Sequence, residues 1–520
     1  MAYTTQSEEA ERISRRFLEL TGLTSIEFEE AQVGHGVFLH FRVGQDAPLY
    51  RWALTTIDNE IGPEHQLHGS LTLSVSNAKF DLNGMEAQIL GSLITRSLRV
   101  TSDQPRNSLV VEFVPFRGGE HRTITQPANH AILGRRGVGK SSLILLGVRK
   151  VASAGHIPVW LDLQPYRGRR EPRCTIEILR EILHVAQRYV LRNQIRARHN
   201  FLADAVKQLD TAMSGSVPTE ESIQAVLPRI RPLIRDFTQA LGKQIYVFLD
   251  DAHLVSPELQ PFLFDAVHSV LKGAGGWLNV AGVKNLTRLY DPHKGMGLQI
   301  PHDAQPVNLD LTLTDPKAAK DHLTAILEKF LRTCGINRTG KVMPDAAVER
   351  LVWCSAGVPR DFLWLFHTAM QHALQNRRPR VGVQEINMAV GEFGHQKMEE
   401  LATDTAEGSS ELEGFLDRLQ AKCLDELKSN SFLVKEAPRR QGYKLLQKLM
   451  DLRLVHLLHP SITPRKAGER HEAYLLDYSF YTGVRRRHGL EELRISSDAP
   501  PRYSVLRRLP KIDVEEITHE

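Results

Sequence analysis

The chain has 520 residues, of which 42% are hydrophobic, 24% charged and 7% aromatic, with a formal net charge of +5. This length fits about three domains, and the ordinary composition excludes a disordered or fibrous chain. Four cysteines are widely separated and form no C-x-x-C pair, which argues against a disulfide framework or a zinc site; they are Cys174, Cys334, Cys354 and Cys423.

The first residues are polar and acidic, unlike a signal peptide, and no apolar run approaches the length needed to cross a membrane. We therefore expect a cytoplasmic protein without a membrane partner.

Residues 1–120 predict an N-terminal β-rich domain that serves recognition or docking. An acidic helix around Ile13 and Phe17 comes first, and short β-like runs follow between Gly, Asn and Pro turns. These runs are residues 25–28, 36–43, 71–75 and 109–116. The region shows no catalytic constellation, and its two strand histidines, His35 and His40, are expected to be structural rather than metal ligands.

Residues 134–141 match every position of the phosphate-loop pattern G-x-x-x-x-G-K-[ST]. A short apolar strand precedes the loop and an apolar helix follows it, which places backbone N–H groups and a helix N-terminus around the phosphates. Lys140 is expected to reach the β- and γ-phosphates, and the Ser141 hydroxyl to contact Mg²⁺. The predicted nucleotide-binding residues are Gly134, Arg135, Arg136, Gly137, Val138, Gly139, Lys140, Ser141 and Ser142. The sequence thus predicts binding of a nucleoside triphosphate.

Residues 121–314 predict an α/β domain built on a five-stranded parallel sheet. Strands are expected at residues 131–133, 157–163, 245–249, 277–283 and 307–311. Helical patterns alternate with them, including a long stretch from 175 to 241 that residues 214–218 interrupt. Such alternation gives a parallel sheet with helices on both faces.

Two acids end the strand at residues 245–249. Because open α/β sheets bind ligands at the carboxyl ends of their strands, Asp250 is predicted to hold Mg²⁺ and Asp251 to face the attacking water. The shorter Asp, where many fast ATPases carry Glu, predicts slow hydrolysis.

The remaining chain predicts three further parts: a helical lid at 315–405, a winged helix at 406–484 and a C-terminal tail at 485–520 that is partly extended. Helices of the lid are expected at 316–331, 344–353, 359–375 and 383–401. In the winged helix, residues 441–450 would form the recognition helix, and residues 454–458 and 473–476 the wing strands.

The winged-helix region is strongly basic. Residues 428–490 hold thirteen Lys or Arg against five Asp or Glu, although the whole chain is only +5. This concentration is the footprint expected of a nucleic-acid contact. The predicted DNA contacts are Arg439, Arg440, Lys444, Lys448, Arg465 and Lys466. A solvated face or a protein-contact module would give the same pattern, so both alternatives stay open.

In combination, these motifs resemble the AAA+/STAND group of P-loop ATPases, most closely the initiator-type, origin-recognition-like members that end in a winged helix. The likeness covers residues 127–483 and depends on the phosphate loop, the Leu249–Asp251 strand end and the Gly357–Leu363 segment. It implies that Pro359 lies near the base and that Arg360 is a second sensor that touches the γ-phosphate. Asn285 matches the first sensor, which orients the attacking water, and Arg288 an arginine finger that acts on a neighbouring subunit.

Two of these residues also have non-functional interpretations: Arg360 could be a solvated arginine at a helix start, and Arg288 a surface arginine in a loop. The leading hypothesis is an ATP switch with slow hydrolysis, using ATP and Mg²⁺. It would control assembly, as a homo-oligomer, on DNA or with a partner effector, with bacterial antiviral defence as a family-level guess. The alternative is a DNA-binding ATPase resembling a replication initiator or helicase loader, and a third hypothesis is a scaffold with a vestigial site.

Overall fold

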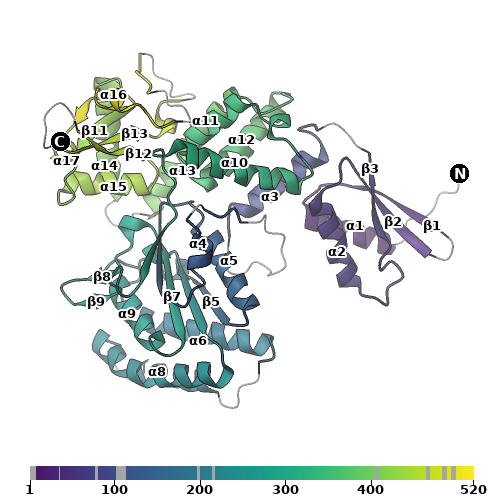
Figure 1. The fold of residues 1–520 in the computed structure, drawn as a ribbon, viewed down its shortest axis with the longest axis horizontal. Helices are drawn as coiled ribbons and strands as arrows, with labels where there is room; N and C mark the ends of the chain where they lie inside the picture. The colour runs from purple at the N-terminus through teal and green to yellow at the C-terminus, as the bar shows by residue number, and fades with distance from the viewer. Residues whose placement is uncertain are drawn as a thin grey trace.

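The computed structural model describes residues 8–33, 36–76, 80–100, 113–116, 118–195, 200–213, 217–404, 409–463, 469–482, 489–493 and 499–519. Figure 1 shows a helix-covered sheet on one side of a helical lid, the N-terminal region beside the lid, and a C-terminal domain on the lid's other flank. Among the described residues, no helix combines the length and the apolar character that crossing a membrane requires.

The N-terminal region is a mixed α+β unit. Its described elements are α1 (Glu8–Thr21), β1 (Glu27–Val33), β2 (Gly36–Val43), α2 (Pro48–Ile61), β3 (Leu71–Val75) and α3 (Met85–Ser97). β1 pairs antiparallel with β2, and β2 pairs parallel with β3. Strands occur at 36–43 and 71–75 as predicted, but helices α2 and α3 were not expected, so the region is less β-rich than the sequence suggested.

Two other N-terminal expectations have different outcomes. The strand expected at 109–116 is absent from residues 113–116, and its remainder lies outside the described residues. His40 lies on β2 with its Nδ1 2.5 Å from the Thr72 hydroxyl, whereas His35 lies outside the described residues.

The described residues between 121 and 314 form the predicted five-stranded parallel sheet, in the order β10-β4-β7-β6-β5. Its strands are β4 (His130–Leu133), β5 (Ile157–Asp162), β6 (Ile245–Asp250), β7 (Gly276–Gly282) and β10 (Gln305–Asn308). The covering helices are α4 (Glu120–Thr123), α5 (Lys140–Ser153), α6 (Arg173–Arg192), α7 (Phe201–Met213), α8 (Glu220–Leu241) and α9 (Gln260–Leu271). A small hairpin, β8 (Tyr290–Asp291) and β9 (Met296–Gly297), follows β7.

Alternation along the strands builds a separate apolar cluster on each face of this sheet. In β6, Val247 and Leu249 join the cluster under α6, α8 and α9. Phe248 faces the opposite side, with Leu143 and Ile144 of α5. Burial on both faces explains why these strands read as continuous apolar runs.

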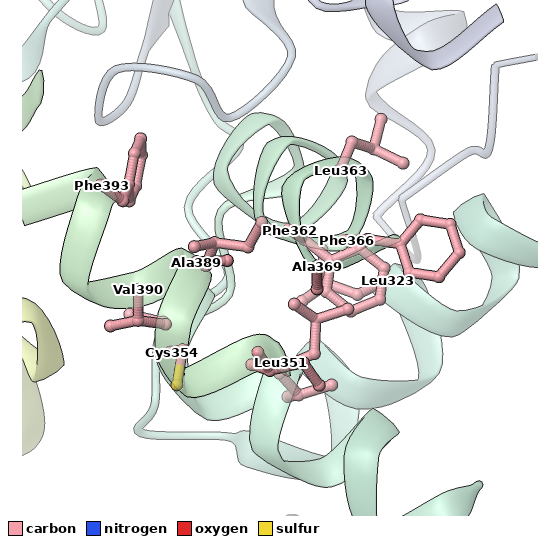
Figure 2. Packing of buried hydrophobic residues seen from close by; sticks show 14 of the residues in the cluster. Leu323, Leu351, Cys354, Phe362, Leu363, Phe366, Ala369, Ala389, Val390 and Phe393 are labelled. Carbon is pink, nitrogen blue, oxygen red and sulfur yellow. The ribbon is translucent and has the colours of Figure 1, made fainter. Parts of the chain in front are cut away.

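The lid consists of α10 (Pro316–Thr333), α11 (Asp345–Ser355), α12 (Pro359–Gln375) and α13 (Val383–Asp404), close to the predicted ranges. The Asp315 carboxylate caps α10 by accepting a hydrogen bond from the Ala318 N–H at 2.9 Å. Figure 2 shows apolar side chains from these helices gathered in one cluster, with Leu323 from α10, Leu351 from α11, Phe366 from α12 and Val390 from α13.

The C-terminal domain packs α14 (Ser409–Gln420) and α15 (Gln441–Asp451) against a sheet of order β12-β13-β11-β14. Its strands are β11 (Ser431–Lys435), β12 (Val455–Ile462), β13 (His471–Leu476) and β14 (Lys511–Ile512). The predicted recognition helix and wing strands are present as α15, β12 and β13, with β12 antiparallel to β13, and the winged-helix assignment itself stays a prediction.

The tail is folded rather than extended over residues 503–519. α16 (Tyr503–Leu506) precedes β14, which pairs parallel with β11, and α17 (Val514–His519) lies against α15. Gly442 allows this close approach, because a Cβ atom there would lie 2.3 Å from the Val514 carbonyl oxygen.

Candidate nucleotide-binding site

The phosphate loop joins β4 to α5, and two of its glycines adopt backbone conformations that other residues rarely take. Gly137 has a φ of +79° and Gly139 a φ of +100°. A Cβ atom on Gly137 would lie 3.0 Å from Arg360 Cβ of the lid. The glycines therefore serve both the turn and the close contact between loop and lid.

Lys140 lies inside this loop, with 7% of the residue exposed. Its ammonium donates to the carbonyl oxygens of Gly134 at 3.0 Å and Arg135 at 2.9 Å. Burial lowers the pKa of Lys140, and three neighbouring carboxylates favour its charged form: those of Asp251, Asp310 and Asp250. A cation is thus held where the loop would wrap phosphates.

Asp250 ends β6 and faces the loop. Its carboxylate accepts hydrogen bonds from the Ser141 hydroxyl and from the Asp251 N–H, the latter at 3.0 Å. Burial and the adjacent Asp251 charge raise the pKa of Asp250 to about 7. A hydroxyl and a buried carboxylate in contact form an oxygen donor pair that suits Mg²⁺, so the residues fit the predicted metal.

Asp251 has a left-handed backbone, with a φ of +52°, and 41% of its side chain is exposed. His253 Nδ1 lies 4.0 Å from Asp251 Oδ1, and this buried nitrogen has no hydrogen-bond partner among the described residues. Burial lowers the pKa of His253 to about 3, so the ring is neutral at pH 7. Sequence reasoning missed His253, although a histidine two residues after Asp251 was a visible signal.

The Arg135 side chain contacts the lid junction and not the phosphate side of the loop. Its Nε donates to Asp310 Oδ1 at 3.2 Å, and its Nη2 donates to the carbonyl oxygens of Leu311 at 2.7 Å and Ala356 at 3.2 Å. The residue is 2% exposed. Any contribution of Arg135 to nucleotide binding is therefore expected from its backbone.

The lid turn before α12 lies directly on the loop, since the Arg360 N–H donates to the Gly137 carbonyl at 3.2 Å. Gly357 makes this turn possible, because a Cβ atom there would lie 2.2 Å from the Leu311 carbonyl oxygen. Pro359 lines a cavity of about 960 Å³ together with Val138, Gly139 and Ser142 of the loop. N-terminal side chains, among them Trp52 and Leu93, line the same cavity.

Asn285 lies in the short helical turn after β7, where its N–H donates to Asp451 Oδ2 of α15 at 2.9 Å. Arg288, three residues on, has 40% of its side chain exposed and forms an ion pair with Asp291 at 3.1 Å. The first-sensor position thus contacts the C-terminal domain, and the proposed finger points to the protein surface.

The candidate DNA contacts surround the start of α15. Arg439, Arg440 and Lys444 are exposed and Lys448 is half-buried, while Arg465 and Lys466 lie outside the described residues. An acid of α17 lies close by, because Glu515 accepts a hydrogen bond from the Tyr443 N–H at 3.2 Å.

No protein-family model matches the chain, and no curated protein matches it in sequence. Solved structures give weak likenesses. The Drosophila origin recognition complex bound to DNA has 13% identity and a TM-score of 0.37, over 82% of this chain and 96% of that one. The ORC1 protein of Aeropyrum pernix in complex with DNA has 15% identity and a TM-score of 0.37, over 71% and 91%. Cdc6p of Pyrobaculum aerophilum has 13% identity and a TM-score of 0.36, over 73% and 93%.

Proposed function

We propose that the chain is a DNA-binding ATPase of the replication-initiator or helicase-loader type, in which slow ATP hydrolysis regulates the C-terminal domain. The observation that carries this proposal is the convergence of Lys140, Ser141 and Asp250 at the carboxyl edge of the parallel sheet. A buried cation and a buried oxygen pair are separate requirements of phosphate and Mg²⁺ binding, and this site meets both.

In this proposal, the N–H groups of the loop and the Lys140 ammonium bind the β- and γ-phosphates. Ser141 and Asp250 hold Mg²⁺, which supplies charge neutralisation at the phosphates when bound. Asp251 positions the attacking water, and its exposed, short side chain accounts for slow hydrolysis. Arg360 reaches the γ-phosphate from the lid, and Pro359 contacts the base beside the cavity.

DNA binding is supported by the exposed cations before and on α15. Arg439, Arg440 and Lys444 lie within six residues and are all exposed, which suits phosphate contacts at the start of a helix. We place the duplex on this face.

Assembly of several copies is the second candidate function, and one observation favours it. Arg288 is 40% exposed on the loop after β7, so it is accessible to a nucleotide bound by a neighbouring subunit. No feature of the described residues bears on antiviral defence or on an effector protein.

The central experiment compares wild-type protein with Lys140→Ala in ATP-binding titrations. We expect Lys140→Ala to lose ATP binding, because the loop would keep its fold but lose its buried cation. Wild-type-like ATP affinity in folded Lys140→Ala protein would refute the proposed site. A salt titration of duplex binding tests the proposed DNA binding. Because phosphate contacts release counterions, the affinity for the duplex must fall steeply as the salt concentration rises.

A further inference from the structure

The end of helix α15 contacts both positions from which bound nucleotide would be sensed. Asp451, its last residue, accepts a hydrogen bond from Asn285, and Arg453, two residues on, forms an ion pair with Asp361 beside Arg360. Both side chains are buried, each residue being 1% exposed. A three-residue segment of the C-terminal domain therefore lies between the two sensor positions.

The Asp451 contact is made by a buried carboxylate. Its Oδ2 lies 2.9 Å from the Asn285 nitrogen, and the Asn285 side chain also hydrogen bonds to it. Two contacts to one residue fix both its backbone and its side-chain direction. Asp451 thus holds the amide that would orient the attacking water.

The backbone of Arg453 also indicates that its side chain has a role at this turn. Arg453 has a φ of +66°, at the position after a helix where glycine is usual. The Arg453 N–H donates to the Met450 carbonyl at 3.0 Å, and the Leu454 N–H to the Leu449 carbonyl at 2.9 Å. Glycine would complete this helix end without strain, so an arginine here indicates that its guanidinium is required.

A second cation fixes the same turn from the lid. Lys397 of α13 donates to the Arg453 carbonyl at 3.2 Å and to Asp477 Oδ2 at 2.6 Å. It also lies 4.0 Å from Asp361 Oδ2. The turn after α15 is therefore held through the Arg453 side chain by α12 and through the Arg453 carbonyl by α13.

We propose that the Asp451–Arg453 turn is a positioning element of the ATPase site: Asp451 orients Asn285, and Arg453 sets Arg360 through Asp361. This inference rests on the proposed function and adds its regulation. Because α15 also carries Lys444, DNA bound to α15 and nucleotide bound to the loop are coupled through this turn. The coupling is reciprocal, so ATP must change DNA affinity by the factor by which DNA changes ATP affinity.

The first test measures kcat for ATP hydrolysis and the Kd for ATP separately in full-length Asp451→Ala. We expect kcat to fall by on the order of tenfold or more, since a misplaced water costs rate, with the ATP Kd changed by less than about threefold. Asp451→Asn keeps an acceptor oxygen at the same place and should retain most of the wild-type kcat. Asp417→Ala, an exposed Asp on α14 of the same domain, is the matched control and should equal wild type.

The second test measures duplex affinity with ATP and with ADP in wild type and in Arg453→Gly. Glycine suits the backbone at 453, so this variant keeps the helix end and removes the Arg453 side chain with its ion pair to Asp361. We expect the ATP-to-ADP ratio of DNA affinity to fall toward one.

A wild-type ratio in Arg453→Gly, or a wild-type kcat in folded Asp451→Ala, would overturn the proposal. If Asp451→Ala does not fold, the ATP-to-ADP ratio of DNA affinity in Arg453→Gly alone tests the proposal. Absent ATP binding by wild-type protein would instead refute the proposed function.

Discussion

The ATPase sheet and the lid-centred part of the molecule bury their apolar residues in different ways. The sheet has its own clusters on its two faces, whereas the N-terminal region, the lid and the C-terminal domain share one continuous apolar cluster. Figure 1 shows the N-terminal region and the C-terminal domain on either side of the lid, with the sheet below it. The apolar residues therefore define two bodies, the sheet and the lid-centred body.

The two bodies also differ in how their buried acids are compensated. In the sheet, burial and Asp251 raise the pKa of Asp250 to about 7. In the lid-centred body, burial opposes ionisation of Asp477, but the Lys397 charge and the His456 hydrogen bond prevail and hold the pKa of Asp477 well below its usual value. The support from Lys397 outweighs the burial of Asp477, whereas the support from Lys140 and Ser141 does not outweigh the burial of Asp250. Buried carboxylates with a raised pKa are typical of functional sites.

The same Asp→Asn change should therefore have opposite effects in the two bodies, with the larger effect at Asp477. Asp477→Asn leaves the Lys397 ammonium buried without its carboxylate, and we expect a loss of about 3–5 kcal/mol in the free energy of unfolding. The stabilisation by Asp477 is present above pH 4 and is lost as the pH falls below its unfolded-state pKa. Chemical denaturation at pH 7 measures the loss, and an unchanged midpoint would contradict the compensated state of Asp477.

Asp250→Asn should stabilise the nucleotide-free protein by about 1–3 kcal/mol at pH 8, because burial and the Asp251 charge disfavour the ionised Asp250 more than Lys140 and the Ser141 hydroxyl support it. A carboxyl whose folded-state pKa is raised contributes stability below its unfolded pKa and loses it as the pH rises. The gain should therefore grow from about pH 4 to pH 7 and then level off. Denaturation curves of both proteins across this range test the sign, and a destabilised Asp250→Asn protein would be the contrary result.

Binding of Mg²⁺ with ATP should release protons near pH 6.5, because Asp250 must ionise to hold the metal. Calorimetry in two buffers of different ionisation enthalpy measures the number released, for which we expect about half a proton or more. Asp250→Asn should release fewer protons in the same titration. Equal release from the two proteins would assign the protons to other groups.

Local motifs account for what could be predicted from the sequence. The phosphate loop, the acids after β6 and the turn before α12 are each contiguous, and each lies where its pattern indicated. The contacts between the bodies are not contiguous: Asn285 and Asp451 are 166 residues apart, and Arg135 and Ala356 are 221 apart. Nothing local distinguishes Arg135 from a phosphate ligand.

The folded tail also depends on a contact between segments that are far apart in the sequence. The two-residue strand β14 has no signal of its own and exists because β11 offers it an edge. The missed helices α2 and α3 likewise bury their apolar faces with other parts of the chain. Such elements depend on tertiary contacts that a pattern within one segment does not contain.

We expect the smallest effect at the proposed DNA-binding face of α15. Substitutions of Lys444 and Lys448 compare an exposed position of this helix with a partly packed one. Lys444 is exposed and Lys448 half-buried one helical turn further along α15. Lys444→Ala should weaken duplex binding about equally for all sequences and reduce the salt slope of the affinity by about 1, the value for one lost phosphate contact. Lys448→Ala should change the slope less, because part of its side chain packs against the domain and less of its charge faces solvent.

Fluorescence anisotropy at several salt concentrations measures both slopes, with the exposed Lys207 on α7 as a matched Lys→Ala control in the other body. A larger slope change for Lys448→Ala would place the duplex further along α15 than proposed, and no change for either variant would remove this helix from the DNA interface.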